Sequence, residues 1–100
     1  MRENNRIHLS AVVVRSQEIL ASRIDEEVVM MNIGHGTYSG LDSIGSEIWD
    51  LLKTPTRVSE ICEALIRKYD VERALCERDV LAFLDDLASD ESITLVDSGR

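Results

Sequence analysis

Two histidines and two cysteines are the side chains of this 100-residue chain best suited to ligate a metal or act as nucleophiles. His8 falls in a polar N-terminal stretch and His35 in a glycine-flanked turn, and neither has a His, Cys or carboxylate neighbour at metal-ligand spacing. Cys62 and Cys76 fall on the apolar faces of predicted helices, where a free cysteine packs as a small hydrophobe. A nucleophilic thiol would also need a base and some exposure. We therefore predict surface histidines, core cysteines and no metal site.

A run of carboxylates near the C-terminus is the remaining candidate for catalysis, and it comprises Asp85, Asp86, Asp90 and Glu91. A solvated helix face accounts for such a run without any chemistry. The chain carries no phosphate-binding loop, no GxSxG and no HExxH. These observations predict a protein that is not an enzyme and holds no cofactor.

The charge balance restricts the kind of partner. The chain has 11 Lys and Arg against 19 Asp and Glu, for a net charge of −8. Nucleic acid binding needs clustered cations, so this charge disfavours it and suits a basic or neutral partner. The N-terminus lacks the apolar run of a signal peptide, and no stretch reaches the length of a membrane span. We expect a cytoplasmic protein with reduced thiols and no membrane partner.

The first half of the chain predicts a sheet. We expect residues 1–10 to form a flexible segment and residues 11–96 a single domain. Ala11–Val14 could form a short strand or pack against the domain, and strand patterns cover residues 18–24, 28–33 and 37–41. Glycines between the last two favour a hairpin. These three strands predict an antiparallel meander.

The second half predicts three helices. Asp42 or Ser43 can cap the first helix, in which Gly45 lies one turn before Trp49 and could let another element approach closely. Residues 58–69 give the cleanest amphipathic pattern, and a third helix carries an apolar face from Cys76 to Leu87. The tail Ser92–Val96 is either a terminal strand or an extended segment. The fold class is α+β: a winged helix-turn-helix-like domain with a three-stranded antiparallel sheet followed by three helices.

A helix-turn-helix arrangement raises the question of DNA binding. The third helix offers Glu77, Asp79, Asp85 and Asp86 against only Arg73 and Arg78, so a duplex would be repelled along much of it. The alternative is a peptide partner. The strand Thr37–Leu41 is expected at an edge of the sheet, where an extended peptide can pair with its backbone. The residues alone leave open whether Ser92–Val96 or another copy of the protein covers that edge.

Three fragments in order resemble one known family: "VVMMNIGHGTYSGLDSIGSEIWDLL", "VSEICEALIRKYDV" and "CERDVLAFLDDLA". The run G-x-Y-x-x-L-x-x-x-G-x-x-I-W from Gly36 to Trp49 is the most specific part. They resemble the PqqD-like family, whose members are RiPP recognition elements that bind the leader segment of ribosomally made, post-translationally modified peptides. In its size the chain looks most like the discrete PqqD-type proteins of lasso peptide pathways.

The resemblance implies that a leader adds as an antiparallel strand beside the third strand, in a cleft lined by the third helix. Carried over to this sequence, the implied peptide-binding residues are Thr37, Tyr38, Ser39, Gly40, Leu41, Asp79, Val80, Phe83, Leu84 and Leu87. Behind the strand, Ile44, Ile48 and Trp49 are expected to brace it. The implied partners are the precursor leader, a cysteine-protease-like leader peptidase of the B2 type and a cyclase. The alternatives are a PqqD-like chaperone of another RiPP or radical-SAM pathway and an acidic winged-helix DNA-binding or interaction module.

Overall fold

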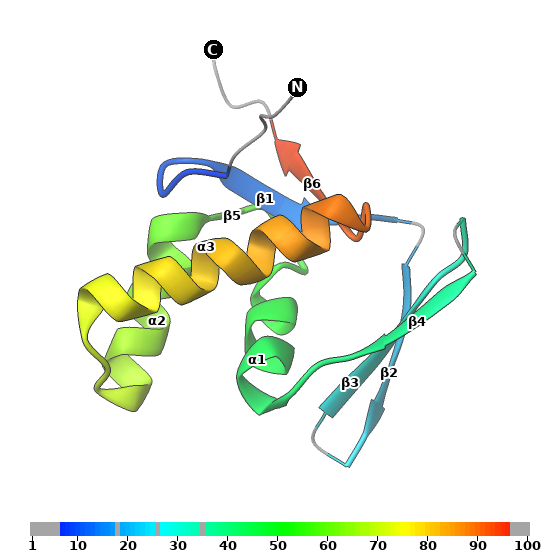
Figure 1. Cartoon of the computed structure of the whole chain (residues 1–100), viewed down its shortest axis with the longest axis horizontal. Coiled ribbons are helices and arrows are strands. Elements are labelled where there is room, and N and C mark those ends of the chain that lie inside the picture. The colour runs from blue at the N-terminus through cyan, green and yellow to red at the C-terminus, as the bar shows by residue number, and fades with distance from the viewer. Residues whose placement is uncertain (1–6, 18, 26, 35, 97–100) are drawn as a thin grey trace.

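The computed structural model describes residues 7–17, 19–25, 27–34 and 36–96. Within these residues, three helices pack with two small antiparallel sheets of three strands each (Figure 1). The predicted α+β architecture, with a three-stranded antiparallel sheet and three helices, is confirmed.

The first sheet, which we call the wing sheet, contains β2 (Ile19–Ile24), β3 (Glu27–Asn32) and β4 (Thr37–Gly40) in the order β2-β3-β4. Both pairings are antiparallel, which confirms the predicted meander. Every second residue of β3, including Val28 and Met30, is buried against the rest of the domain. The opposite face is open, and Leu20 and Tyr38 are exposed on it. An apolar run in one strand with one face buried is the usual pattern of an antiparallel sheet.

The second sheet is a correction to the expected single sheet. Its central strand β1 (Val12–Arg15) lies between β5 (Thr56–Arg57) and β6 (Ile93–Val96). The pairing buries Val13 and Ile93, apolar side chains that an isolated tail would leave in water. The open question about Ser92–Val96 is thereby resolved, because its strand pairs with β1 and not with β4.

The N-terminal boundary also needs correction. We expected residues 1–10 to be flexible, and of these the structure describes residues 7–10. Ile7 is buried in the core, and the carbonyl of Leu9 accepts a hydrogen bond from the backbone N–H of Ser59. Burial of one apolar side chain extends the packed domain to Ile7.

The helices are α1 (Ser43–Leu51), α2 (Val58–Tyr69) and α3 (Arg73–Ser89). Asp42 is the N-cap of α1, where its carboxylate accepts the backbone N–H of Gly45 at 2.7 Å. The core contains side chains from all three helices and both sheets, with Trp49, Leu52, Ile61, Leu84 and Val13 among its largest fully buried members.

Ser46 joins α1 to the wing sheet. Its hydroxyl accepts the backbone N–H of Val28 at 2.8 Å and donates to the carbonyl of Leu41 at 3.3 Å. Leu41 in turn donates its N–H to the Val28 carbonyl at 2.8 Å. The hydroxyl therefore bridges Val28 and Leu41, the last backbone pair between β3 and the chain that leaves β4. This bridge fixes the end of β4 against α1.

We expect Ser46→Ala to lower the free energy of unfolding by about 1–3 kcal/mol, because it leaves a buried N–H and a buried C=O without partners. Urea denaturation monitored by circular dichroism measures this loss. Ser43→Ala is the matched control, since Ser43 is exposed at the start of the same helix. Equal midpoints for the two variants would show that the hydroxyl bridge contributes nothing.

Candidate binding groove

A groove of about 430 Å³ opens where the end of β4 meets all three helices. Its floor and walls are mainly apolar, and its lining comprises Gly40, Leu41, Asp42, Ile44, Gly45, Ile48, Leu65, Tyr69, Val71, Leu75, Cys76, Asp79, Val80 and Phe83. Several of these side chains remain partly in water, and Ile44 and Leu75 are both 43% exposed. An apolar concavity with a few polar groups is the usual form of a binding site.

Gly45 permits the closest packing in this groove. A Cβ at this position would lie 3.2 Å and 3.3 Å from two ring atoms of Phe83 and 3.2 Å from a carboxylate oxygen of Asp42. The ring of α3 therefore rests directly on the first turn of α1. The prediction that Gly45 lets another element approach closely is confirmed.

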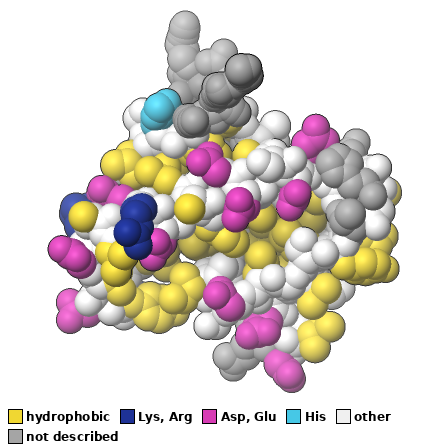
Figure 2. Space-filling view, in the orientation of Figure 1, with side chains coloured by type: hydrophobic (Ala, Val, Ile, Leu, Met, Phe, Trp, Pro, Cys, Tyr) yellow, Lys and Arg dark blue, Asp and Glu magenta, His cyan; other side chains and the backbone are white. Residues whose placement is uncertain are grey.

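The charge of the groove is acidic. Asp42 and Asp79 are its charged lining residues, and no Lys or Arg is among the described residues that line it. Figure 2 shows carboxylates along α3 above the apolar surface that lies between this helix and the elements below it. A ligand that fills the groove would thus meet apolar surface bordered by negative charge.

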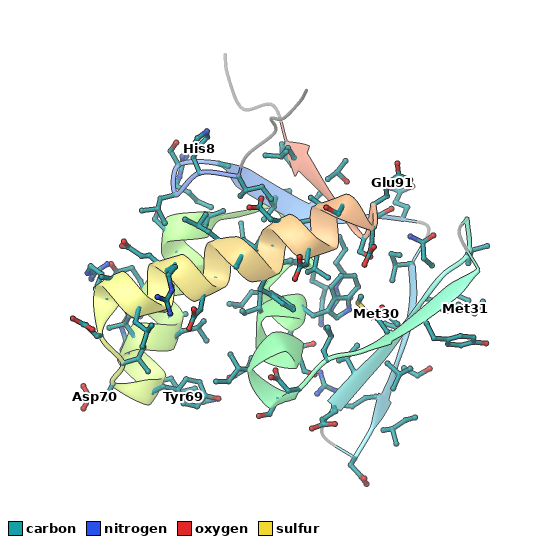
Figure 3. All side chains as sticks on the ribbon, in the orientation of Figure 1. His8, Met30, Met31, Tyr69, Asp70 and Glu91 are labelled. Carbon is teal, nitrogen blue, oxygen red and sulfur yellow. The ribbon has the colours of Figure 1, made fainter. Side chains whose placement is uncertain are left out.

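A polar network closes the groove at the end of α2. The Tyr69 hydroxyl donates to a Glu47 carboxylate oxygen at 2.5 Å, and Lys68 pairs with the other oxygen of the same carboxylate. Hydrogen bonds from Lys68 and then from Tyr69 lower the pKa of Glu47. Figure 3 shows the ring of Tyr69 at the end of α2, extending toward α1. The network holds one wall of the groove in place.

The backbone of β4 presents an open edge beside the groove. The hydrogen bond from Leu41 to Val28 places these two residues in a hydrogen-bonded pair, and such pairs alternate along an antiparallel ladder. Ser39 therefore points its N–H and C=O toward β3, whereas Tyr38 and Gly40 point theirs away from the sheet. β4 is an edge strand, and Ser92–Val96 does not cover it.

The structure brings together part of the set of predicted site residues. Gly40, Leu41, Asp79, Val80 and Phe83 line the groove, while exposed Tyr38 and Ser39 continue from it along β4. Thr37 begins the same strand. Leu84 and Leu87 instead point into the core and are 0% and 4% exposed. Of the expected braces, Ile48 and Trp49 are buried, whereas Ile44 is exposed, and both Ile44 and Ile48 line the groove.

The sequence analysis missed groove residues at the end of α2, in the link that follows it and in the first turn of α3. Tyr69, Val71 and Leu75 all line the groove and are all more than a third exposed. The apolar period of residues 58–69 places Tyr69 on the amphipathic face of its helix and gives no indication of a groove. The available signal was an apolar residue within the polar link "DVE", which a purely structural turn does not need.

The candidate metal and nucleophile residues lie as expected where they are described. Cys62 and Cys76 are buried free thiols, and the Cys76 thiol points to the Cys62 carbonyl at 3.9 Å. Burial raises the pKa of Cys62 to about 11, so this thiol is protonated at neutral pH. His8 is exposed, and His35 lies outside the described residues. Among the residues that the structure describes, no three His, Cys, Asp or Glu side chains gather as metal ligands, and no helix could span a bilayer.

Comparison with known proteins gives a consistent result. Residues 27–93 match the family model described as coenzyme PQQ synthesis protein D (PqqD). A structure described as TbiB1 in complex with the TbiA(beta) leader peptide has 39% sequence identity and a TM-score of 0.76, over 87% of this chain and 99% of that one. A second structure, described as lasso peptide synthetase B1 complexed with the leader peptide, has 23% identity and a TM-score of 0.74, over 82% of this chain and 96% of that one. The curated proteins contain no match.

Proposed function

The chain belongs to the PqqD family, and from this membership we propose that it is a non-catalytic protein that binds the leader segment of a ribosomally made precursor peptide. The observation that carries the proposal is the open edge of β4 beside an apolar groove. The 39% identical relative, which was solved with a leader peptide, supports the same assignment.

The backbone of β4 would supply most of the affinity. Tyr38 and Gly40 direct their N–H and C=O groups outward, so an antiparallel leader strand would exchange hydrogen bonds with these two residues. Such bonds depend little on the leader's side chains. A strand of this kind would extend the wing sheet beyond β4.

The groove would supply selectivity. Side chains of paired residues lie on the same face of a sheet. A leader residue opposite Leu41 would therefore share its inward face and enter the groove, while a residue opposite Tyr38 would share its outward, exposed face. An apolar leader side chain fits the first position, and the border of Asp42 and Asp79 favours a nearby Lys or Arg.

Binding would deliver the precursor peptide to a maturation enzyme and would not itself catalyse a reaction. A protein that holds the leader and also contacts a maturation enzyme raises the local concentration of each for the other. We propose a lasso peptide pathway, with a leader peptidase of the cysteine-protease-like B2 type and a cyclase as the enzymes served.

A second candidate function is a chaperone for another RiPP or radical-SAM pathway. The family description, which names coenzyme PQQ synthesis, supports this candidate. Titration with the leader of each precursor encoded near this gene separates the two, because only the cognate leader should bind tightly.

The charge of the groove leads to a test of leader binding. We expect a fluorescein-labelled cognate leader with a Lys or Arg near the docked segment to bind about tenfold more weakly at 500 mM than at 50 mM NaCl, because salt screens its attraction to Asp42 and Asp79. Fluorescence anisotropy measures the dissociation constant.

Asp79→Asn should weaken binding at low salt and reduce the salt dependence, while Asp85→Asn, elsewhere on the same helix, is the matched control. Salt-independent binding by the wild-type protein would exclude the electrostatic part of the proposal. Absence of binding to any leader at every salt concentration, or tighter binding to a DNA duplex, would exclude the function itself.

A further inference from the structure

A second, smaller hollow lies on a different face of α1 from the groove. It has a volume of about 230 Å³ and opens between the end of α1 and strand β2 of the wing sheet, and we call it the α1–β2 pocket. Its charged lining residues are Arg15, Arg23, Asp50 and Lys53, and Trp49 also lines it. No described residue lines both this pocket and the groove.

Cations outnumber carboxylates in the α1–β2 pocket. Its described lining contains three Lys or Arg side chains and one Asp, in a chain that has 11 Lys and Arg against 19 Asp and Glu. The groove has the opposite composition, since Asp42 and Asp79 line it and no described Lys or Arg does. The protein therefore presents two concave surfaces of opposite charge.

One ion pair joins the wing sheet to α1 across the pocket. Arg23 donates from Nη2 to both carboxylate oxygens of Asp50, at 2.8 and 2.7 Å. Arg15 lies farther from the same carboxylate, with 3.6 Å between its Nη2 and Oδ1. A single carboxylate cannot neutralise two guanidinium groups, so one positive charge remains among these three side chains.

Arg15 is held in a fixed orientation beside this pair. Its Nε donates to the carbonyl of Trp49 at 3.0 Å, and its guanidinium carbon lies 4.7 Å from the centroid of the Trp49 ring. The side chain still keeps 27% of its surface exposed. Burial lowers the pKa of Arg15, Asp50 raises it, and the like charge of Arg23 lowers it again. A further carboxylate would offset that repulsion, and the orientation of the guanidinium limits the side-chain entropy that binding would cost.

Lys53 adds a cation that the fold does not use. It is exposed just after α1, and no described carboxylate forms an ion pair with its ammonium group. The carbonyls at the end of α1 carry roughly half a negative charge, which offsets only part of the excess in the pocket. The Arg23–Asp50 pair is enough to fasten the wing sheet to α1, so a structural role leaves Lys53 unexplained.

We propose that the α1–β2 pocket binds an acidic segment of a partner protein, whose carboxylates contact Arg15 and Lys53. Charge complementarity identifies this occupant, because guanidinium groups pair well with carboxylates. A nucleic acid would extend beyond the pocket onto a surface that is acidic overall, whereas a short run of Asp and Glu need cover only the pocket.

The partner and a leader could bind at the same time. In Figure 1, α1 lies between α2 and the wing sheet. The groove is lined from α1 by Ile44, Gly45 and Ile48, and the pocket by Trp49 and Asp50. The proposal does not rest on leader binding, since it concerns a separate set of residues.

An NMR titration of the ¹⁵N-labelled full chain tests the proposal. The probe is an acetylated hexaglutamate peptide at about 20 mM NaCl, where screening is weak, and a hexaglutamine peptide is the neutral control. We expect saturable shifts of the amide signals of Asp50 and Lys53 and of the Nε signal of Arg15, with the acidic peptide only. Shifts that gather elsewhere, or no saturable shift up to about 5 mM peptide, would overturn the proposal.

A pair of charge reversals separates the pocket from net charge. Lys53→Glu should weaken hexaglutamate binding by about tenfold, because it replaces an attraction by a repulsion. Arg67→Glu is the matched control, since it makes the same change at an exposed position of α2 outside the pocket, and it should alter binding by less than about twofold. Equal losses in the two variants would show that the peptide responds only to net charge and would exclude the site.

Inorganic phosphate at the same ionic strength distinguishes a protein partner from a small anion. It should shift the same signals more weakly than the peptide does, because a single anion cannot contact Arg15 and Lys53 as a run of carboxylates can. Tighter binding of phosphate than of hexaglutamate would assign the pocket to a small anion and contradict the proposal.

Discussion

Tyr38→Pro is expected to weaken binding of the cognate leader by about 100-fold and to leave the protein folded. The alternation of the β3–β4 ladder directs the N–H of Tyr38 outward, so proline removes a donor to the leader and none to β3. A leader carbonyl left without a donor costs about 1–3 kcal/mol, and the ring adds a steric obstacle to the incoming strand. Isothermal titration calorimetry gives the affinity, and thermal unfolding gives the stability.

Two substitutions separate the backbone from the side chain. Tyr38→Ala keeps the N–H and removes a ring that is 74% exposed, so we expect affinity within about fivefold of wild type. Ser39→Pro deletes an N–H that bonds β3, so it should destabilise the wing sheet itself. Unchanged leader affinity in a folded Tyr38→Pro protein would place the leader on another surface.

The fold could be predicted where the relevant signal is local. The continuous apolar run after Glu27 identifies a central strand, and the change to a 3.6-residue period after Asp42 identifies a helix with its cap. The two-residue strand β5 and the pairing of β1 with β6 carry no such signal, because their partners are distant in the sequence and short strands have no measurable period. The second sheet was missed for that reason.

Only part of the groove lining could be predicted from the sequence. The family resemblance indicated groove residues in β4 and in the middle of α3, but it did not indicate Tyr69, Val71 or Leu75. These three become neighbours of β4 only because α2 and α3 pack against α1, a tertiary arrangement that hydrophobic periodicity does not specify. Periodicity likewise cannot separate Phe83, which lines the groove, from Leu84, which is fully buried beside it in the sequence.

Gly45→Val should be the most damaging single change inside the groove. A Cβ at Gly45 would already lie 3.2 Å from the Phe83 ring, so the larger side chain must displace that ring from the wall. Overpacking of this kind costs about 1–3 kcal/mol. We expect leader affinity to fall about 30-fold, which is about 2 kcal/mol of binding free energy, and the free energy of unfolding to fall by less than that. The fall in affinity is measured by the same leader titration.

A rescue experiment identifies the contact as the cause. Phe83→Leu removes the ring atoms that the new side chain would strike, so the double variant should recover most of the affinity that Gly45→Val loses, relative to Phe83→Leu alone. Gly40→Ala is the matched glycine control. A Cβ at Gly40 would meet nothing within 4 Å, and the variant keeps the outward N–H of β4. If the effects of Gly45→Val and Phe83→Leu simply add, the groove does not depend on the approach of α3 to α1. Coupling between them would show that this one glycine sets the position of the wall that the leader contacts.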